Sequence, residues 1–325
     1  MLITGGAGYI GSHLALLLQE QGYRVTLFDD LSTGNADLVS ESNLVVGDIL
    51  DTAALISVMK EHHISSVVHL AAKSSVPESF IHPDIYFETN ADGTKCVIEA
   101  CAEAGVQHLL FSSTAAVYGN ATHGLVSEEA PLQPISPYGE SKLEAEQWVS
   151  TLCARYGINQ ITFRYFNVIG AHPQGFLGQC NPKSEHLLQC CLNAIGENAP
   201  LEVYGDDYDT ADGSAERDFI HVQDLASLHL QAIHYLEHDG ESLLINAGYG
   251  IAHSVKEFIR TFQQVTGANL QLHYGPRRNG DPASLIADVS HLNRKLDWTP
   301  KFNSLEQMIG DSWLWENSPA RQGMR

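Results

Sequence analysis

Short apolar stretches alternate with longer segments of helical periodicity over the first half of the chain. The predicted strands are residues 2–4, 24–30, 43–49, 65–72, 108–114 and 161–170, and the predicted helices are residues 12–22, 51–63, 87–104 and 138–156. Several of the strand stretches are apolar throughout, which is typical of strands that are buried on both faces. This alternation predicts an α/β fold, in which helices flank a doubly wound parallel sheet.

The pattern changes after Gly170. Residues 171–184 and the acidic, glycine-rich residues 206–218 are not predicted to form packed elements. We therefore expect one domain over residues 1–170. Residues 171–325 should form mainly a second, smaller domain, with some segments that return to the first.

Composition narrows the class of protein. The 325 residues carry a formal net charge of −21 with no run rich in Lys and Arg to offset it, which argues against nucleic acid as a partner. The six cysteines form no C-x-x-C pair and the sixteen histidines are scattered, so we expect reduced thiols and no metal site. The chain opens on a strand pattern rather than a signal peptide, and no apolar run is long enough to cross a membrane. The sequence predicts a cytoplasmic protein without a membrane partner.

A glycine-rich turn joins the first predicted strand to the first helix. The stretch "TGGAGYIG" contains a G-x-G-x-x-G pattern that ends at Gly11. Glycines in this context allow a tight turn and a close approach of the backbone to a pyrophosphate at the helix N-terminus. The second strand ends in Asp29 and Asp30, and a carboxylate there bonds the adenosine ribose and repels a 2′-phosphate. Residues 1–170 are thus predicted to be a Rossmann domain that binds NAD.

The stretch "SPYGESK" holds Tyr138 and Lys142 four residues apart, the spacing at which two helical side chains share a face. Pro137 disfavours helix for the residue before it, so Ser136 is predicted to be a loop edge and Tyr138 the start of a helix. The ammonium would lower the pKa of the phenol and let it act as a general base near neutral pH. Taken alone, the pattern is also that of an ordinary amphipathic first turn.

A hydroxyl group is predicted beside this pair. Thr114 ends the strand at residues 108–114, at the edge of the sheet where open α/β proteins bind ligands. Together with Tyr138 and Lys142 it would form a catalytic Ser/Thr–Tyr–Lys set.

Several motifs give the chain a resemblance that covers essentially its whole length. The glycine loop, "FSSTAAVYG" (111–119), "SPYGESK" and "RYFNVIGAHP" (164–173) resemble the extended short-chain dehydrogenase/reductase superfamily. Within it, "YGDDYDTADGSAERDFIHVQDLA" (204–226) and "PRRNGDPASLIAD" (276–288) resemble the UDP-glucose 4-epimerases. The resemblance implies a homodimeric, cytoplasmic isomerase that interconverts UDP-glucose and UDP-galactose by transient oxidation at C4′ with tightly bound NAD. It also implies that the second domain binds the UDP-hexose.

The resemblance assigns roles to individual residues. Tyr138 resembles the catalytic base, Lys142 the residue that lowers its pKa and holds the nicotinamide ribose, and Thr114 the partner of the sugar 4′-hydroxyl. Besides these three, the residues that resemble cofactor contacts are Gly5, Gly8, Tyr9, Ile10, Gly11, Asp29, Asp30, Asp48, Ile49, Leu70, Ala71, Ala72, Lys73, Asn90 and Phe166. Those that resemble substrate contacts, besides Thr114 and Tyr138, are Asn167, Glu202, Val203, Tyr204, Arg217, Arg278, Asp281 and Leu285. Two arginines suit a diphosphate because guanidinium groups offer paired donors.

The two residues after Thr114 distinguish an epimerase from related nucleotide-sugar enzymes. Nucleotide-sugar dehydratases and decarboxylating relatives carry acids directly after the catalytic threonine, whereas this chain has Ala115 and Ala116, which favours an epimerase. A catalytically silent NAD-binding regulatory protein stays open as an alternative, although such relatives typically lose the tyrosine or the lysine.

The preferred sugar is not determined by the sequence. In the family, a tyrosine at the position of Leu285 restricts the pocket to hexoses with a 2-hydroxyl, whereas cysteine or serine admits an N-acetyl group. Leucine is intermediate in size, so activity on the UDP-N-acetylglucosamine pair, even as the main activity, stays open. The segment 184–191 is one residue shorter than the usual pattern, which leaves the contact around His186 open as well.

Overall fold

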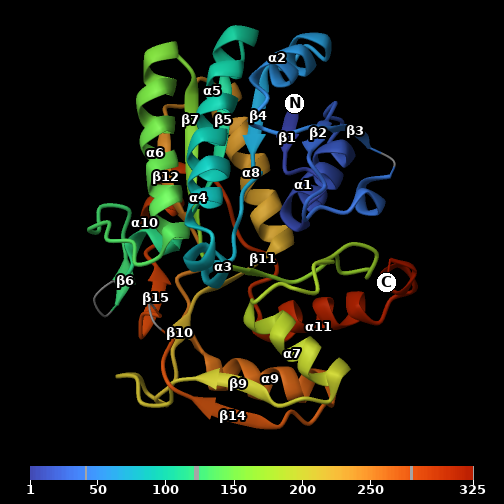
Figure 1. Ribbon diagram of the computed structural model, residues 1–325, viewed down its shortest axis with the longest axis vertical. Coiled ribbons are helices and arrows are strands. Elements are labelled where there is room, and N and C mark those ends of the chain that lie inside the picture. Colours follow the sequence, from blue (N-terminus) through green and yellow to red (C-terminus); the bar gives the residue numbers. More distant parts are fainter. Residues whose placement is uncertain (41, 121–123, 279–280, 325) are drawn as a thin grey trace.

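A seven-stranded parallel sheet forms the core of the upper half of the molecule in Figure 1. The computed structural model describes residues 1–40, 42–120, 124–278 and 281–324. In spatial order the strands are β12 (Leu243–Ala247), β7 (Asn159–Tyr165), β5 (His108–Thr114), β4 (Ser66–His69), β1 (Leu2–Thr4), β2 (Thr26–Asp29) and β3 (Asn43–Val46). Each strand runs parallel to its neighbours. The predicted α/β fold with a doubly wound parallel sheet is confirmed.

Helices cover both faces of this sheet. On one face α1 (Tyr9–Glu20) packs against α8 (Val222–Glu237), and on the other α5 (Gly93–Ala104) packs against both α2 (Thr52–Glu61) and α6 (Pro137–Tyr156). Each face has its own core of buried apolar side chains, one shared by α1 and α8 and the other by α2, α5 and α6. Because both faces are covered, most strand positions are apolar, which is the pattern that predicts these strands.

The order of the strands reverses between β1 and β4. From β1 the chain adds β2 and β3 on one side, and from β4 it adds β5, β7 and β12 on the other. Ligands of open α/β sheets bind at such a reversal, at the carboxyl ends of the strands. The loops that follow β1, β2, β4 and β5 all begin at this edge.

The predicted strand at residues 161–170 is two strands in the structure. After β7, the amide of Asn167 donates to the carbonyl of Asp218 (3.0 Å) instead of to the large sheet. This bond begins a separate parallel pair between β8 (Asn167–Ile169) and β11 (Phe219–His221). Residues that follow β7 are thereby directed out of the sheet and over its carboxyl edge.

Three other boundaries also differ. The predicted helix at residues 87–104 begins with a π-helical turn over Phe87–Asp92, and only then continues as α5. The first helix begins at Tyr9 rather than at residue 12, because the glycine turn leads directly into it. The polar segment 206–218 is not wholly irregular, since it ends in the short strand β10 (Glu216–Arg217).

The lower half of Figure 1 contains smaller sheets and a third apolar core. Its strands are β6 (Leu125–Val126), β9 (Leu201–Tyr204), β13 (His253–Ser254), β14 (Leu272–Gly275) and β15 (Ser284–Ala287), arranged with β10 as the sheets β13-β10-β15-β6 and β14-β9. The core lies between α7 (Leu187–Glu197), α9 (Val255–Thr266) and α11 (Leu305–Glu316). The remaining helices are α3 (Val76–Ile81), α4 (Pro83–Tyr86), α10 (Ser290–Lys295) and α12 (Pro319–Gly323), with 3₁₀ turns over Ala36–Val39 and Ala115–Tyr118. Among the described residues, no helix combines the length and apolar character needed to cross a membrane.

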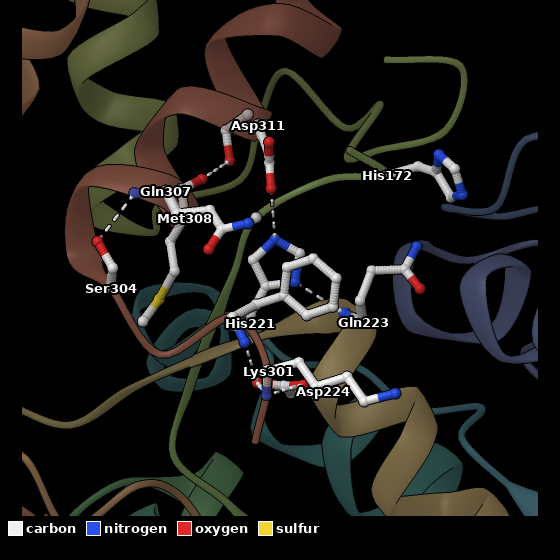
Figure 2. A network of polar contacts seen from close by, with 12 residues as sticks. His172, His221, Gln223, Asp224, Lys301, Ser304, Gln307, Met308 and Asp311 are labelled. Carbon is white, nitrogen blue, oxygen red and sulfur yellow. Dashed lines mark hydrogen bonds and ion pairs between the residues drawn. The ribbon is translucent and has the colours of Figure 1, made fainter. Parts of the chain in front are cut away.

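A buried carboxylate joins α8 to the segment that leads into α11 (Figure 2). Asp224, which is 1% exposed, accepts hydrogen bonds from the amides of Lys301 (2.9 and 3.0 Å) and Phe302 (2.9 Å). It also accepts the hydroxyl proton of Tyr249 at 2.6 Å. One side chain therefore satisfies three donors and holds the C-terminal segment on the helix layer of the large sheet.

A histidine continues this network toward α11. His221, which is fully buried, accepts the amide proton of Gln223 at Nδ1 (3.0 Å), so a neutral ring carries its proton on Nε2. That Nε2 lies 3.3 Å from the carboxylate of Asp311 on α11 (Figure 2). The ring also fills the space beside Gly170, where an added Cβ would lie 2.5 Å from it. The end of β8 is thus packed against the contact between α8 and α11.

Replacing Asp224 with alanine should lower the free energy of unfolding by roughly 3 kcal/mol or more, because buried donors lose a charged acceptor. Asp224→Asn keeps one acceptor oxygen and should lose less. Chemical denaturation followed by circular dichroism measures both. The matched control is Asp92→Ala, which removes an exposed carboxylate with no capping bond and should change stability by less than about 0.5 kcal/mol. Equal losses in Asp224→Ala and the control would contradict this role.

Candidate active site

The helix that carries Tyr138 begins at Pro137, one residue before the predicted start. Ser136 has an extended conformation and its hydroxyl accepts the amide proton of Gly139 at 3.2 Å, which makes it the N-cap of α6. Pro137 follows at the first helical position, where its missing N–H costs nothing. Tyr138 is therefore held in the first turn of a twenty-residue helix.

Tyr138 and Thr114 are brought together by the packing of α6 on β5. The side chain of Thr114 lies close enough to the Tyr138 hydroxyl to lower the pKa of the phenol. The oxygen of Thr114 already accepts the amide proton of Ala116 at 3.1 Å, so its own proton is free to be donated to Tyr138. Tyr86 contacts the Tyr138 ring edge-on, with centroids 6.3 Å apart. The phenol is thus oriented from two sides.

The charges differ from the sequence-based expectation that an ammonium lowers the pKa of the tyrosine. Burial raises the pKa of Tyr138, and the side chain of Thr114 offsets only part of this. Lys142 is itself buried, and its pKa falls to about 7 although Glu146 acts in the opposite direction. Loss of hydration therefore outweighs the effect of Thr114 on the phenol and the effect of Glu146 on the ammonium.

The glycine loop after β1 is shaped for a close ligand. Gly5 has φ +69°, and an added Cβ would lie 2.6 Å from the amide nitrogen of Ala71. A Cβ on Gly11 would lie 2.2 Å from the carbonyl oxygen of Gly5. Gly8 precedes α1 in an extended conformation without any side-chain cap, so backbone N–H groups at the start of the helix stay available for an anion.

The two aspartates at the end of β2 have different surroundings. Asp29 is 7% exposed, and its two oxygens accept the amide protons of Ala7 in the glycine loop and of Leu31, both at 2.9 Å. Burial raises its pKa while these two bonds lower it. Asp30 is exposed and bonds only to Ser32 among the described residues. Asp29 is therefore the carboxylate fixed to the glycine loop, with further lone pairs for a ribose.

The segment after β4 is fixed by a buried amide. Asn90, which is fully buried, accepts the amide proton of Lys73 (2.8 Å) and donates to its carbonyl (3.0 Å). The same side chain donates to the hydroxyl of Ser141 at 3.0 Å, between Tyr138 and Lys142 in sequence. This amide thus links the loop that faces the glycine turn to the helix of the tyrosine and lysine.

The other predicted cofactor residues follow the strand ends. They are Tyr9 and Ile10 at the start of α1, Asp48 and Ile49 after β3, Leu70, Ala71 and Ala72 after β4, and Phe166 after β7. The hydroxyl of Tyr9 donates to the carbonyl of Gly170 at 2.5 Å. Ile49 and Phe166 are buried. All these positions therefore lie at the carboxyl edge of the large sheet.

The predicted substrate residues lie mainly on the smaller sheets. Arg217 on β10 pairs with Asp281 at 3.3 Å, and the guanidinium of Arg278 lies 4.1 Å from the ring centroid of Tyr204 on β9. Asn167 donates to the Asp218 carbonyl at 3.1 Å, directly beside Arg217 in sequence. The two predicted arginines thus lie on neighbouring segments. Arg217 is on β10, and Arg278 follows β14.

Three remaining positions have particular surroundings. Glu202 pairs with His273 at 2.6 Å, whereas Val203 is 2% exposed and packs into the third core, so only its backbone is available to a ligand. Leu285 on β15 is buried in a cluster with Phe166 and Ala115, the residue after Thr114. Leu285 therefore lies close to the segment that carries the threonine.

Sequence reasoning missed the polar residues behind Lys142. Glu146 accepts two hydrogen bonds from Arg164, at 2.9 and 2.7 Å, and a third from Ser113. The sequence signal was the continued four-residue spacing from Tyr138 through Lys142 to Glu146. Among the described residues, no group of three or more His, Cys, Asp or Glu side chains is placed to hold a metal ion.

Comparison with known proteins agrees with this geometry. Residues 1–248 match the model of the NAD dependent epimerase/dehydratase family. This chain belongs to that family. Its sequence is 41% identical over 320 residues to a UDP-glucose 4-epimerase of Azospirillum brasilense, which covers 98% of this chain and 92% of the relative. The expectation of NAD as the cofactor is confirmed for this family member.

Solved structures show the same fold. The crystal structure of a UDP-glucose-4-epimerase from Stenotrophomonas maltophila with bound NAD and formylated UDP-arabinopyranose has a TM-score of 0.93 and 39% identity, over 99% of this chain and 98% of the other. A UDP-Glc/GlcNAc 4-epimerase from Campylobacter jejuni has a TM-score of 0.85 and 38% identity, over 97% and 98% of the two chains. The resemblance to UDP-glucose 4-epimerases is therefore confirmed over nearly the full length.

Replacing Gly11 with alanine should reduce the NAD that copurifies and lower the free energy of unfolding by roughly 1–3 kcal/mol, because the new methyl group meets the carbonyl of Gly5. Gly196→Ala is the matched control. No atom lies within 4 Å of its added Cβ, so that variant should keep its NAD and gain about 0.5–1 kcal/mol. Mass spectrometry of the released cofactor and thermal denaturation measure the two effects. Normal NAD content in Gly11→Ala would contradict the prediction that the glycine loop after β1 binds NAD.

Proposed function

We propose that this protein is a UDP-glucose 4-epimerase that interconverts UDP-glucose and UDP-galactose. The observation that carries the proposal is the placement of Tyr138 beside Thr114 at the carboxyl edge of the sheet, across the strand reversal from the glycine loop after β1. Family membership and about 40% identity to curated UDP-glucose 4-epimerases support the same conclusion.

The residues of the site fit the steps of this reaction. NAD, when bound, supplies reversible oxidation at C4′ of the hexose. Tyr138 accepts the proton of the sugar 4′-hydroxyl and later returns it, while Thr114 orients that hydroxyl. Lys142 binds the nicotinamide ribose, and the remaining residues predicted as cofactor contacts hold the dinucleotide along the strand ends.

The nucleotide half of the substrate is assigned to the smaller sheets. Arg217 and Arg278 bind the diphosphate, and Tyr204 with its neighbours contacts the uracil. These charges grip the part of the substrate that does not react, which leaves the hexose free to present either face. Residues 171–325, apart from the returning β12 and α8, are accordingly assigned to nucleotide-sugar binding, and residues 1–170 to NAD.

Other activities of the family have less support. Ala115 is buried and neither it nor Ala116 can act as an acid, so elimination of water has no donor at these positions. Activity on the N-acetylated pair remains a second candidate, because the Campylobacter jejuni relative is a UDP-Glc/GlcNAc 4-epimerase at 38% identity. A catalytically silent protein would have no need to keep Tyr138 beside Thr114 and Lys142 on the same helix face.

We also propose that the enzyme is a cytoplasmic homodimer that contacts its copy through α6. The outer face of α6 has a groove of about 480 Å³ that is lined by Phe87, Leu143 and Trp148 among others. An aromatic groove of this kind is typical of a surface that is covered by another chain.

Tyr138→Phe should lower turnover of UDP-galactose to UDP-glucose by about 10²–10⁴-fold, because a general base is lost. The fold and the bound NAD should be retained, since only a hydroxyl is removed. A coupled assay of product formation measures the rate, and mass spectrometry measures the cofactor. Near-normal turnover would exclude Tyr138 as the base, and absence of turnover in the unaltered enzyme would reject the proposed reaction.

Leu285 is expected to set the range of sugars. An unpaired amide costs about 1–3 kcal/mol unless water reaches it, so leucine should allow weaker activity on the N-acetylated pair beside good activity on the glucose pair. Leu285→Tyr should remove the weaker activity selectively, whereas Leu285→Ser should raise it. Side-by-side assays on UDP-glucose and UDP-N-acetylglucosamine decide the point. Equal loss of both activities in Leu285→Tyr would indicate a packing role in the cluster with Phe166.

A further inference from the structure

The ammonium group of Lys142 has little access to water. Lys142 is 2% exposed, and its Nζ lies 4.4 Å from the centroid of the Phe111 ring on β5. Burial disfavours the charged form and lowers the pKa of Lys142 to about 7. The face of a benzene ring attracts a cation but does not replace its lost hydration. A lysine in this position needs a nearby negative charge to stay protonated.

Glu146 has the right position to provide that charge. It follows Lys142 by four residues, so the two side chains share a face of α6. Phe111 and Ser113 share a face of β5, because side chains two residues apart along a strand point the same way. Lys142 lies over Phe111, and the hydroxyl of Ser113 donates to Glu146. The ammonium and the carboxylate are therefore neighbours over one strand.

Arg164 fixes the carboxylate from the other side. It lies on β7 directly opposite Ser113 in the sheet register. Its Nε and one terminal nitrogen donate to the two oxygens of Glu146 at 2.9 and 2.7 Å, in the forked geometry that arginine prefers. Its other terminal nitrogen donates to the hydroxyl of Tyr118 (2.9 Å) and the carbonyl of Glu128 (3.1 Å). Glu146 is thus fixed by Arg164 and Ser113 on the face of α6 that also carries Lys142.

Burial favours the neutral forms of His69 and of the tyrosines near Lys142. Several elements pack around this part of α6 and carry further titratable groups. These groups include His69 on β4, Tyr165 on β7, Tyr86 on α4 and Glu78 on α3. They also include Lys95, Glu99 and Glu103 on α5, and the exposed Glu88 and Asp92 of the π-helical turn. Burial, with Lys142 itself, lowers the pKa of His69 to about 3, and burial raises the pKa of Tyr138, Tyr165 and Tyr86. Glu78 accepts the proton of Tyr86, and Lys95 lies over the outer ring of Trp148.

We propose that Glu146, held by Arg164 and Ser113, is a positioning residue whose negative charge keeps Lys142 protonated beside Tyr138. The pair of Glu146 and Arg164 is then more than a structural ion pair, because the carboxylate raises the pKa of Lys142 and the guanidinium lowers it. The effect of Glu146 on turnover rests on the proposed epimerase function. The effect of Glu146 on the charge of Lys142 does not depend on that function.

Two variants of the same ion pair separate this role from a structural one. Glu146→Gln removes the negative charge and should lower the pKa of Lys142 by about one unit. Arg164→Met removes the competing positive charge and should raise it by a similar amount, because Glu146 then faces Lys142 alone. The measurement is ¹³C NMR of the NAD-bound protein labelled at the lysine side-chain carbon, with Lys142→Met to assign the signal.

The turnover profile gives a second measurement. The high-pH limb of kcat/KM for UDP-galactose should move to lower pH in Glu146→Gln and to higher pH in Arg164→Met, while a merely structural pair would lose activity in both variants without opposite shifts. Glu103→Gln is the matched control, since it breaks the exposed pair with Lys60 and should shift neither measurement. Shifts in the same direction, or no shift of the Lys142 pKa in either variant, would overturn the proposal.

A double variant tests the proposal if the single variants do not fold. The double variant Glu146→Gln/Arg164→Met removes both members of the ion pair together, and buried pairs often tolerate such neutral replacement. Its Lys142 pKa should lie below that of the unaltered protein, because the nearer of the two removed charges is the negative one. An unchanged value would overturn the proposal. The NMR result stands even if the protein does not turn over UDP-hexoses, so failure of the proposed function would be recognised separately.

Discussion

The packing of α6 onto β5 and β7 is the interaction on which the site depends. The helix buries an apolar face in the core that it shares with α2 and α5, yet the same face carries a lysine and a glutamate. These polar groups are tolerated because Arg164, Ser113 and the Phe111 ring provide partners for them. These partners hold the docked helix on the strands in the placement that brings Tyr138 beside Thr114.

Burial has a cost that shapes the chemistry of this site. Both the phenol and the ammonium are less easily ionised in the protein than in water, so their spacing alone does not produce a reactive tyrosine. The charge state of Lys142 depends on a second layer of residues that never needs to touch a ligand. Such layers are what hold catalytic groups within a narrow range of geometry and proton affinity.

Polar groups join the two halves of the molecule, in addition to the apolar cluster of Ala115 and Phe166 with Leu285. Asp224 fixes the C-terminal segment to α8, and His221 approaches Asp311 on α11 beneath the end of β8. β8 leads out of the large sheet and pairs with β11, so the chain segment after Phe166 connects both halves. The sugar and the cofactor are thereby assigned to opposite sides of one short, well-anchored stretch of backbone.

Local chemistry allowed the sequence alone to predict the parallel sheet, the glycine turn and a helix start close to Tyr138, because each depends on residues close in the chain. Motifs along the whole chain indicated the family. Whether Asp29 or Asp30 reaches the glycine loop could not be read, since that depends on how β2 ends beside β1. The split of the strand after Tyr165 and the ion pair between Glu146 and Arg164 also required the tertiary structure. Burial and pairing across distant segments decide these features, and neither is encoded in any one local pattern.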